Sequence, residues 1–467
     1  MVVTMPKAPL ILLINPWVTD FAAYDLWAKP LGLFLLGSLL RSGGCGIAFV
    51  DCMDRHDGFT LQHPDVVSGS ERKYGTGKYP KMRIPKPLPY AEIPRYYHRY
   101  GVHPDSFRRK LHAIEEPDLI WVTSIMTYWY PGIQETVEVI REVFPEVPIW
   151  LGGIYAQLCN RHAQEAIGAT EVVTHPLERL PDQIAAATGY SLANRHQWMS
   201  FESSPPPAWD LLGRLAYVPL LTGLGCTFRC PYCASKILQP KWQRRSANAI
   251  FEDISHWHQS HGVVDFAFYD DALLIGFETS LAPVLKRISK DLPRLRFHTP
   301  NAVHIGALTP ECCHLLHESG FTTLRLGLET TRAEKQQDWG GKVKPEMFES
   351  TVRNLLAAGF SPGQLGVYLL CGLPGQTPEE VAEAIDVVKQ TGALPFIAEY
   401  SPIPGTPMWQ DAVNRCQFDI SGEPLYHNNS FFACRRPEFS YHDLQELKDL
   451  ARCARRQDHQ RSTLRQG

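Results

Sequence analysis

The sequence predicts an α/β protein with an N-terminal doubly wound parallel sheet followed by a partial (β/α)6 barrel. Short apolar runs alternate with helical patterns through the first 174 residues, and the alternation resumes after a Pro-rich stretch at 203–207. Strand–helix alternation is typical of parallel sheets covered by helices. Six further strand-like runs then favour an incomplete barrel. We expect the sheet domain at 1–200, the barrel at 208–410 and a helical extension at 411–467.

The N-terminal domain is predicted to contain five strands, at 10–15, 47–52, 119–124, 149–151 and 171–174. Helical spacing of apolar residues is found at 31–41 and 131–144. Ligands of such sheets bind beyond the carboxyl ends of the strands. The residues expected at that edge are Asn15, Ser124, Gly152, Gly153 and Tyr155.

A basic insert at about 56–118 interrupts this pattern. Within it, residues 71–110 carry 11 Lys or Arg against 3 acidic residues, together with six Tyr. One interpretation is a lid or clamp on an acidic or nucleic-acid substrate. The other, which we favour, is an insert whose aromatic residues pack over the neighbouring surface.

The barrel strands are predicted at 218–222, 264–269, 296–299, 322–326, 366–370 and 396–400. From Tyr441 the sequence has the pattern of a basic amphipathic helix, which we expect to pack at the end of the barrel. A net charge of -3 argues against binding nucleic acid or membranes by bulk attraction. No apolar run reaches the roughly 18 to 20 residues of a membrane span. The N-terminal apolar run is followed by Pro16-Trp17 rather than a small-residue cleavage site, so we expect a cytoplasmic protein with reduced cysteines.

Three of the 12 cysteines are closely spaced. Cys226, Cys230 and Cys233 have the spacing C-x3-C-x2-C directly after the first barrel strand. Three thiolates so close together can surround one soft-metal centre. In a four-iron cluster they would leave one iron open to chelate an amine and a carboxylate. Structural zinc is the main alternative, but no second cysteine pair with zinc-ligand spacing is found; a chance triad of free thiols is the other.

The segment CTFRCPYC, with Tyr232 before the third cysteine, resembles the cluster loop of the radical S-adenosylmethionine (SAM) enzymes. Later segments resemble the strand ends of that barrel in the same order, over about 215–411. They are Arg244-Arg245-Ser246, Phe268-Tyr269-Asp270-Asp271, Thr299-Pro300-Asn301, Gly327-Leu328-Glu329-Thr330, Gly372-Leu373-Pro374-Gly375 and Pro402-Ile403-Pro404-Gly405.

The resemblance implies a 4Fe-4S cluster on the three cysteines and SAM on its open iron. It also implies an external one-electron donor such as flavodoxin or ferredoxin, and a 5'-deoxyadenosyl radical that abstracts hydrogen from an unactivated carbon. The implied SAM residues are Tyr232, Asp270, Asp271, Glu329, Gly372 and Pro374. Each has a structural alternative: a helix cap for the aspartates, a structural hydrogen bond for Glu329, and a tight turn at 372–375.

The N-terminal domain resembles the Rossmann-like cobalamin-binding domains of one radical SAM subclass. The similar segments are Asn15-Pro16, Pro30-Leu31-Gly32-Leu33, Val50-Asp51 and Gly152-Gly153-Ile154-Tyr155. Two features depart from it. A glycine-glutamate turn is replaced by 174–178, and Asp54-Arg55-His56-Asp57-Gly58 is one residue short of the axial-ligand motif Asp-x-His-x-x-Gly. His56 is either a cobalt ligand or a loop histidine, and we favour the loop histidine.

The leading hypothesis is a cobalamin-dependent radical SAM methyltransferase. A cobalamin-independent radical SAM enzyme acting on a peptide, nucleic acid or small molecule is the second, and a non-enzymatic iron-sulfur or redox protein is the third. A methylthiolating enzyme is less favoured because only Cys45, Cys52 and Cys159 are available for a second cluster.

Overall fold

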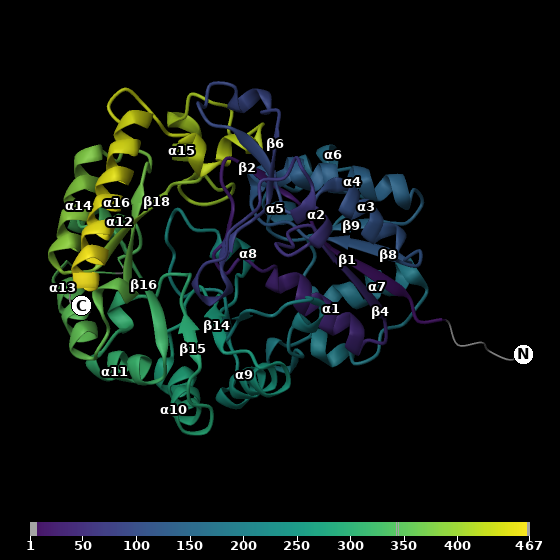
Figure 1. Cartoon of the computed structure of the whole chain (residues 1–467), viewed down its shortest axis with the longest axis horizontal. Coiled ribbons are helices and arrows are strands. Elements are labelled where there is room, and N and C mark those ends of the chain that lie inside the picture. The colour runs from purple at the N-terminus through teal and green to yellow at the C-terminus, as the bar shows by residue number, and fades with distance from the viewer. Residues whose placement is uncertain (1–6, 342, 344, 465–467) are drawn as a thin grey trace, which may run out of the picture. The chain divides into compact units, whose positions relative to one another are not determined.

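The computed structural model describes residues 7–341, 343 and 345–464; residues 1–6, which precede the N-terminal apolar run, lie outside it (Figure 1). The chain forms two compact units. The first comprises Met1–Ala216 with Pro424–Tyr426, and the second comprises Tyr217–Glu423 with His427–Gly467.

The first unit is built on a five-stranded parallel sheet. Its strands are β1 (Leu10–Asn15), β4 (Gly46–Asp51), β8 (Leu119–Val122), β9 (Ile149–Leu151) and β10 (Glu171–Val172). They are ordered β10-β9-β8-β1-β4, and β1 pairs with β4 from Leu10 and Gly46 to Asn15 and Asp51. β4 is thus added on one side of β1, and β8, β9 and β10 are added on the other side. The strand order therefore changes direction between β1 and β8, and doubly wound sheets bind ligands at such a point.

Helices cover both faces of this sheet, which confirms the doubly wound prediction. Leu12 and Ile14 of β1 pack in one core layer with α4 (Tyr130–Val143), α5 (Ile154–Leu158) and α6 (Asn160–Ala166). Ile11 and Leu13 point the other way, into a layer with α1 (Leu31–Ser42) and α7 (Leu180–Thr188). Burying each such side chain contributes about 1.5–3 kcal/mol, which is why both faces of the strands are apolar.

The basic insert is an ordered subdomain. It contains α2 (Gly58–Gln62), β5 (Gly77–Lys78), β6 (Lys81–Ile84), β7 (Tyr97–Tyr100) and α3 (Pro104–His112). β7 lies between β6 and β2 (Val18–Asp20) in an antiparallel sheet, and β5 pairs with β3 (Tyr24–Asp25). Tyr97 and Tyr100 are buried, and the Tyr97 hydroxyl donates a hydrogen bond to the Thr19 carbonyl at 3.0 Å. The Tyr100 hydroxyl donates to the Phe21 carbonyl at 3.0 Å, so these aromatic residues pack against the chain that follows β1.

The second unit is an open parallel sheet of six strands, as predicted for a partial barrel. The strands, in sheet order, are β11 (Val218–Leu220), β14 (Asp265–Phe268), β15 (Arg296–His298), β16 (Phe321–Glu329), β17 (Leu365–Cys371) and β18 (Leu394–Glu399). The connecting helices are α9 (Ala247–His261), α10 (Leu281–Asp291), α11 (Pro310–Glu318), α12 (Ala333–Asp338), α13 (Pro345–Ala357) and α14 (Pro378–Gln390). Figure 1 shows the long helices along the outer side of the strands.

Shorter elements complete this unit. They are the hairpin of β12 (Gly223–Leu224) and β13 (Gln243–Arg244), α8 (Ser235–Leu238), α15 (Trp409–Arg415) and α16 (Tyr441–Leu464). α16 packs against β18 and α14 through the buried residues Leu444, Leu447 and Ala451, as expected for an end helix. None of the described helices is both long and apolar enough to pass through a bilayer.

Candidate active site

A cavity of about 620 Å³ in the second unit contains all three clustered cysteines. Cys226, Cys230 and Cys233 line it together with Asp271, which follows β14, and Glu329, the last residue of β16. The other lining residues are Phe228, Arg229, Ser235, Lys236, Ile237, Pro300, Asn301, Ala302, Val303, His304, Gly327, Tyr368 and Pro407. The carboxyl ends of several barrel strands therefore converge on the cysteines, where parallel barrels place their active sites.

The three thiols provide the soft donors that an iron-sulfur cluster requires, and all three line one cavity. A four-iron cluster binds each thiolate on a different iron, so the donors present fit that group.

Asp270 holds the start of the cysteine loop in place. Its carboxylate is 3% exposed and accepts hydrogen bonds from the Thr222 backbone N–H at 3.1 Å and from the Thr222 hydroxyl at 2.6 Å. The Arg244 guanidinium completes the arrangement at 3.2 Å. Asp270 is not among the residues that line the cavity. Its contacts thus link the end of β14 to the chain that follows β11, and it caps no helix.

Asp271, the next residue, faces the cavity. Because side chains alternate along a strand and its extension, adjacent residues at this strand end point in different directions. Surrounding protein partly desolvates the Asp271 carboxylate and raises its pKa, and a hydrogen bond from Ser235 acts in the opposite direction. The structure thus separates two aspartates that the sequence left equivalent.

Glu329 adopts an uncommon backbone conformation, with φ at 66°. A non-glycine residue in this region carries strain of about 1–3 kcal/mol. The pairing of β16 with β17 shifts register between Gly327 and Glu329, which turns the Glu329 side chain toward the cavity. A Cβ atom at Gly327 would lie 3.1 Å from Glu329 Oε1, so a glycine there leaves room for the carboxylate.

Tyr232, Gly372 and Pro374 are not among the lining residues. Burial, and then the charges of Glu329 and Cys230, raise the pKa of Tyr232. Gly372 has φ at 87°, and its N–H donates to Gln376 Oε1 at 2.7 Å. A Cβ at Gly372 would lie 2.3 Å from the Phe432 ring. Gly372 therefore belongs to a tight turn that the Gln376 side chain closes.

The comparisons with known proteins agree with this geometry. Residues 220–388 match the model of the Radical SAM superfamily. The chain carries a radical SAM domain. A match to this superfamily implies a 4Fe-4S cluster and SAM as cofactors.

Two curated relatives are similar over part of their length. One is a methyltransferase of Pyrococcus horikoshii, 24% identical over 45% of this chain and 46% of the relative. The other is the tRNA-2-methylthio-N(6)-dimethylallyladenosine synthase of Frankia alni, 24% identical over 57% of this chain and 55% of the relative. The chain thus spans about half the length of the curated relatives it matches.

Two solved structures share the fold over most of the chain. One is the radical SAM methyltransferase TsrM of Kitasatospora setae, solved with cobalamin and a 4Fe-4S cluster. The match covers 88% of this chain and 76% of the TsrM chain, with 18% identity and a TM-score of 0.64. The other is the cobalamin-dependent SAM radical enzyme OxsB. The match covers 87% of this chain and 55% of the OxsB chain, with 13% identity and a TM-score of 0.56.

The radical SAM domain has further cavity residues that the sequence analysis did not assign. Asn301 donates its side-chain N–H to the Tyr269 carbonyl at 2.8 Å, and the Tyr368 hydroxyl donates to the Pro300 carbonyl at 3.1 Å. The rings of Phe228 and His304 stack at 4.2 Å. Asn301 follows a predicted strand, so its place at the cavity was readable. His304 lies in a loop and Tyr368 lies inside β17. Neither position is at a strand end, so the local sequence pattern does not indicate that these residues line the cavity.

Ahead of the radical SAM domain, the residues predicted for cobalamin lie at the carboxyl ends of the sheet strands. Asn15 donates to Asp51 Oδ1 at 2.7 Å, joining β1 to β4. The Ser124 hydroxyl donates to the Gly152 carbonyl at 2.7 Å. Gly153 has φ at 101°, and a Cβ there would lie 2.2 Å from the Ser124 carbonyl oxygen. This turn therefore requires glycine and brings the β8 and β9 ends together.

Two predicted residues of this unit have side-chain partners of their own. Tyr155 is fully buried, and its hydroxyl lies 2.6 Å from His162 Nδ1. His56 lies between Arg214, at 3.5 Å, and Glu71, at 4.0 Å. Burial and the positive charges of Arg214 and Arg55 lower the pKa of His56. Its position agrees with the loop-histidine interpretation.

Proposed function

We propose that this protein is a radical SAM methyltransferase that uses cobalamin as its methyl carrier. The observation that carries the proposal is that three cysteines, Glu329 and Asp271 line one cavity. When bound, the 4Fe-4S cluster and SAM supply one-electron cleavage of the sulfonium, and cobalamin supplies a transferable methyl group. An external one-electron donor, such as flavodoxin or ferredoxin, would reduce the cluster.

The chain's own residues would hold and orient these groups. Cys226, Cys230 and Cys233 would ligate three irons of the cluster. Glu329 would pair with the SAM amine or bind its ribose, and Asp271 would accept hydrogen bonds from ribose hydroxyls. The largely apolar remainder of the wall, including Phe228 and Val303, would keep water from the reacting atoms.

The N-terminal sheet supports the cobalamin part of the proposal. Its strand order reverses between β1 and β8, and the residues just beyond that point are Asn15 and Ser124. Gly152 and Gly153 follow the neighbouring strand. Both solved structures that share this fold are named as cobalamin enzymes. We therefore assign Asn15, Ser124, Gly152, Gly153 and Tyr155 to the edge that would receive the cofactor.

Methylthiolation is named for the relative from Frankia alni, but the cysteines of the first unit do not support it here. Cys45 and Cys52 lie in the two core layers on opposite faces of the sheet. Burial raises the pKa of Cys159 to about 12.

The test is anaerobic reconstitution with iron and sulfide, followed by incubation with SAM and reductant, with and without hydroxocobalamin. We expect 5'-deoxyadenosine in both cases. We expect additional S-adenosylhomocysteine when the cobalamin is present, because its Co(I) form, produced by the reductant, would accept the methyl group of SAM. The control variant Cys453→Ala removes an exposed cysteine outside the cavity and should behave like the parent chain. Cluster formation without any SAM cleavage in the presence of cell extract as a substrate source would favour a non-enzymatic iron-sulfur protein instead.

A further inference from the structure

A glutamine side chain is buried behind the turn that carries Glu329. Gln336 belongs to the short helix α12, which follows β16, and it is only 5% exposed. A buried side-chain amide is costly unless it finds hydrogen-bond partners. The partners of Gln336 are two main-chain carbonyls, one on each side of Glu329 in the sequence.

The amide nitrogen of Gln336 donates to both carbonyls. Gln336 Nε2 donates to the Thr330 carbonyl oxygen at 2.6 Å and also to the Leu328 carbonyl oxygen. Because a carbonyl oxygen can only accept, the amide must present its NH2 group to this pair rather than its oxygen. Each of the two amide hydrogens therefore has an acceptor, and residues 328 and 330 are fixed to a single side chain.

The residue between these carbonyls has a strained backbone. Glu329 has φ at 66°, and the Thr330 N–H donates to the Leu328 carbonyl at 2.7 Å. This is a γ-turn with a positive φ at its centre, which is a rare and strained type. Such a conformation persists only when the surrounding structure requires it. The Gln336 side chain supplies that requirement, because it holds the carbonyls at both ends of the turn.

The main chain of Gln336 holds a second segment, which lies beside one of the clustered cysteines. The Gln336 carbonyl accepts the Gly341 N–H at 2.7 Å. A Cβ atom at the preceding residue, Gly340, would lie 3.2 Å from Cys230 Sγ, so the chain passes directly against this thiol. Gln336 therefore connects the turn at Glu329, through its side chain, with the segment beside Cys230, through its main chain.

We propose that Gln336 is a positioning residue for SAM binding. It is not among the residues that line the cavity, so it acts through Glu329, by holding the turn that directs this carboxylate into the cavity. The inference rests on the proposed role of Glu329 in binding SAM. A side chain that only joined α12 to β16 could bond to any free carbonyl of the strand. This one bonds on both sides of the one described residue of β16 that has a positive φ.

This role separates two properties of the site. Loss of the amide donors releases the turn at Glu329, so SAM affinity should fall. The main-chain carbonyl of residue 336 is unaffected by a side-chain substitution and still accepts the Gly341 N–H. The segment beside Cys230 should therefore keep its position, and the cluster should assemble normally.

The experiment compares the parent chain with Gln336→Met, which keeps the length of the side chain but has no donor. Before reconstitution, hydrogen–deuterium exchange of residues 327–332 should be faster in Gln336→Met, because the Thr330 N–H loses its protection when the turn opens. After reconstitution with iron and sulfide, calorimetric titration with SAM alone should give a Kd about tenfold higher, equivalent to about 1.4 kcal/mol. Iron content per chain should equal that of the parent. The control Gln337→Met makes the same substitution at the exposed neighbouring residue and should match the parent in all three measurements.

Gln336→His serves as the rescue variant. Its ring keeps one N–H donor at a similar reach, so we expect a Kd between those of the parent and Gln336→Met. It decides the test if Gln336→Met does not fold, and SAM affinity equal to that of the parent would then overturn the proposal.

The titration of the parent separates this inference from the proposed function. A parent chain that holds the cluster but does not bind SAM would overturn the proposed function and the role of Gln336 with it. If the parent binds SAM and Gln336→Met binds it equally tightly, only the role of Gln336 is overturned. Unchanged hydrogen–deuterium exchange at 327–332 would likewise show that the amide does not hold the turn.

Discussion

The absence of a side chain at Gly327 leaves room for the Glu329 carboxylate at the cavity. A Cβ atom at Gly327 would lie 3.1 Å from Glu329 Oε1, closer than nearly all such contacts in proteins. Glu329 itself has φ at 66°, and the sheet register shifts between the two residues. Strained backbone of this kind persists where the surrounding structure requires it and is common at ligand sites. The relationship leads to two predictions.

Gly327→Ala should displace the Glu329 carboxylate and weaken SAM binding. We expect about a tenfold loss, equivalent to about 1.4 kcal/mol, measured by calorimetry on the reconstituted protein. Gly213→Ala is the control, since a Cβ at Gly213 meets nothing within 4 Å. Unchanged SAM affinity in Gly327→Ala would show that the carboxylate position does not matter for SAM.

Glu329→Gln should weaken SAM binding by a similar factor without loss of stability. The substitution keeps the size and hydrogen-bonding capacity of the side chain but removes the charge that would pair with the SAM amine. Thermal unfolding should show a melting temperature equal to that of the parent. A fall in melting temperature with normal SAM affinity would instead support the structural role of Glu329.

Asp270→Ala should destabilise the second unit strongly. It removes both hydrogen bonds to Thr222 and leaves the buried Arg244 guanidinium without its carboxylate, at a cost of about 3–5 kcal/mol. Thr222→Ala alone should cost about 1–2 kcal/mol. Denaturant unfolding of both single variants and the double variant should therefore give a coupling free energy above about 1 kcal/mol.

The control for this series is Asp291→Ala. Asp291 pairs with Arg287 across one turn of an exposed helix surface at 3.5 Å, and such pairs contribute about 0–1 kcal/mol. Additive effects of the Asp270 and Thr222 substitutions would contradict the anchoring role and return Asp270 to the set of ligand-binding candidates.

Gly153→Ala should destabilise the first unit by about 2 kcal/mol or more and abolish retention of cobalamin. A Cβ there would lie 2.2 Å from the Ser124 carbonyl oxygen, in addition to the cost of φ at 101°. Gly168→Ala measures the cost of a positive φ alone, because Gly168 has φ at 70° and open space around its Cβ position. Unfolding curves and the absorbance of bound hydroxocobalamin after gel filtration measure the two effects. If both variants retain cobalamin equally, the β8 and β9 ends are not its site.

Replacing Cys226, Cys230 and Cys233 with Ala should abolish cluster absorbance and all SAM cleavage. All three sulfurs line the same cavity, and loss of a ligand leaves too few thiolates for the cluster. Iron and sulfide content, visible absorbance and 5'-deoxyadenosine formation are the measurements. A variant that still holds the cluster would exclude this triad as its ligand set.

Much of the fold could be predicted because the strands of both sheets are apolar runs separated by helical patterns. The antiparallel sheet of the insert could not. It forms when Val18–Asp20 pairs with Tyr97–Tyr100. A local sequence pattern does not indicate which distant segment a strand pairs with. The signal in the insert was its aromatic content, which indicated packing but not strand pairing.

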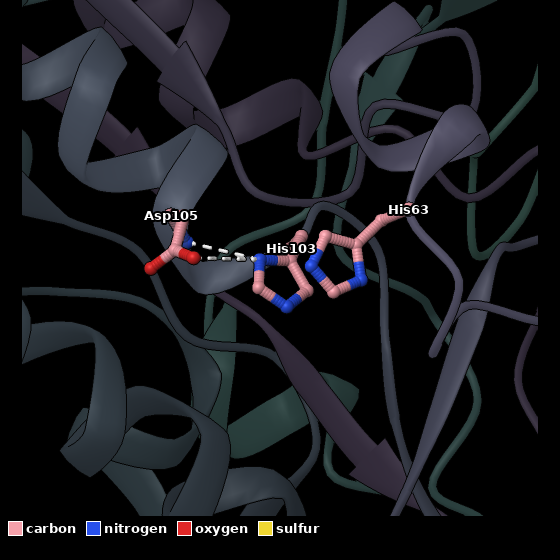
Figure 2. Close-up of side chains that lie close together, drawn as sticks. All are labelled: His63, His103 and Asp105. Atoms are coloured by element: carbon pink, nitrogen blue, oxygen red, sulfur yellow. Dashed lines mark hydrogen bonds and ion pairs between the residues drawn. The ribbon is translucent and has the colours of Figure 1, made fainter.

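The candidate site divides in the same way. The cysteine triad and Glu329 are readable because their spacing and their places at strand ends are local features. Gly372 and Pro374 share that kind of signal, yet Gly372 closes a turn against Phe432 and Gln376. The stacking of His63 on His103 (Figure 2) could not be predicted, because the two residues are 40 positions apart in the sequence.

The sequence by itself determined the α/β alternation, the succession of two parallel sheets, and the close spacing of the three thiols that we propose as cluster ligands. These follow from periodicity and spacing over a few residues, which the backbone converts directly into faces and loops. The tertiary structure alone decided that Asp271 faces the cavity while Asp270 binds Thr222, and that His63 stacks on His103. Such contacts depend on strand register and on where crossovers return the chain, and both are settled by the packing of the whole unit.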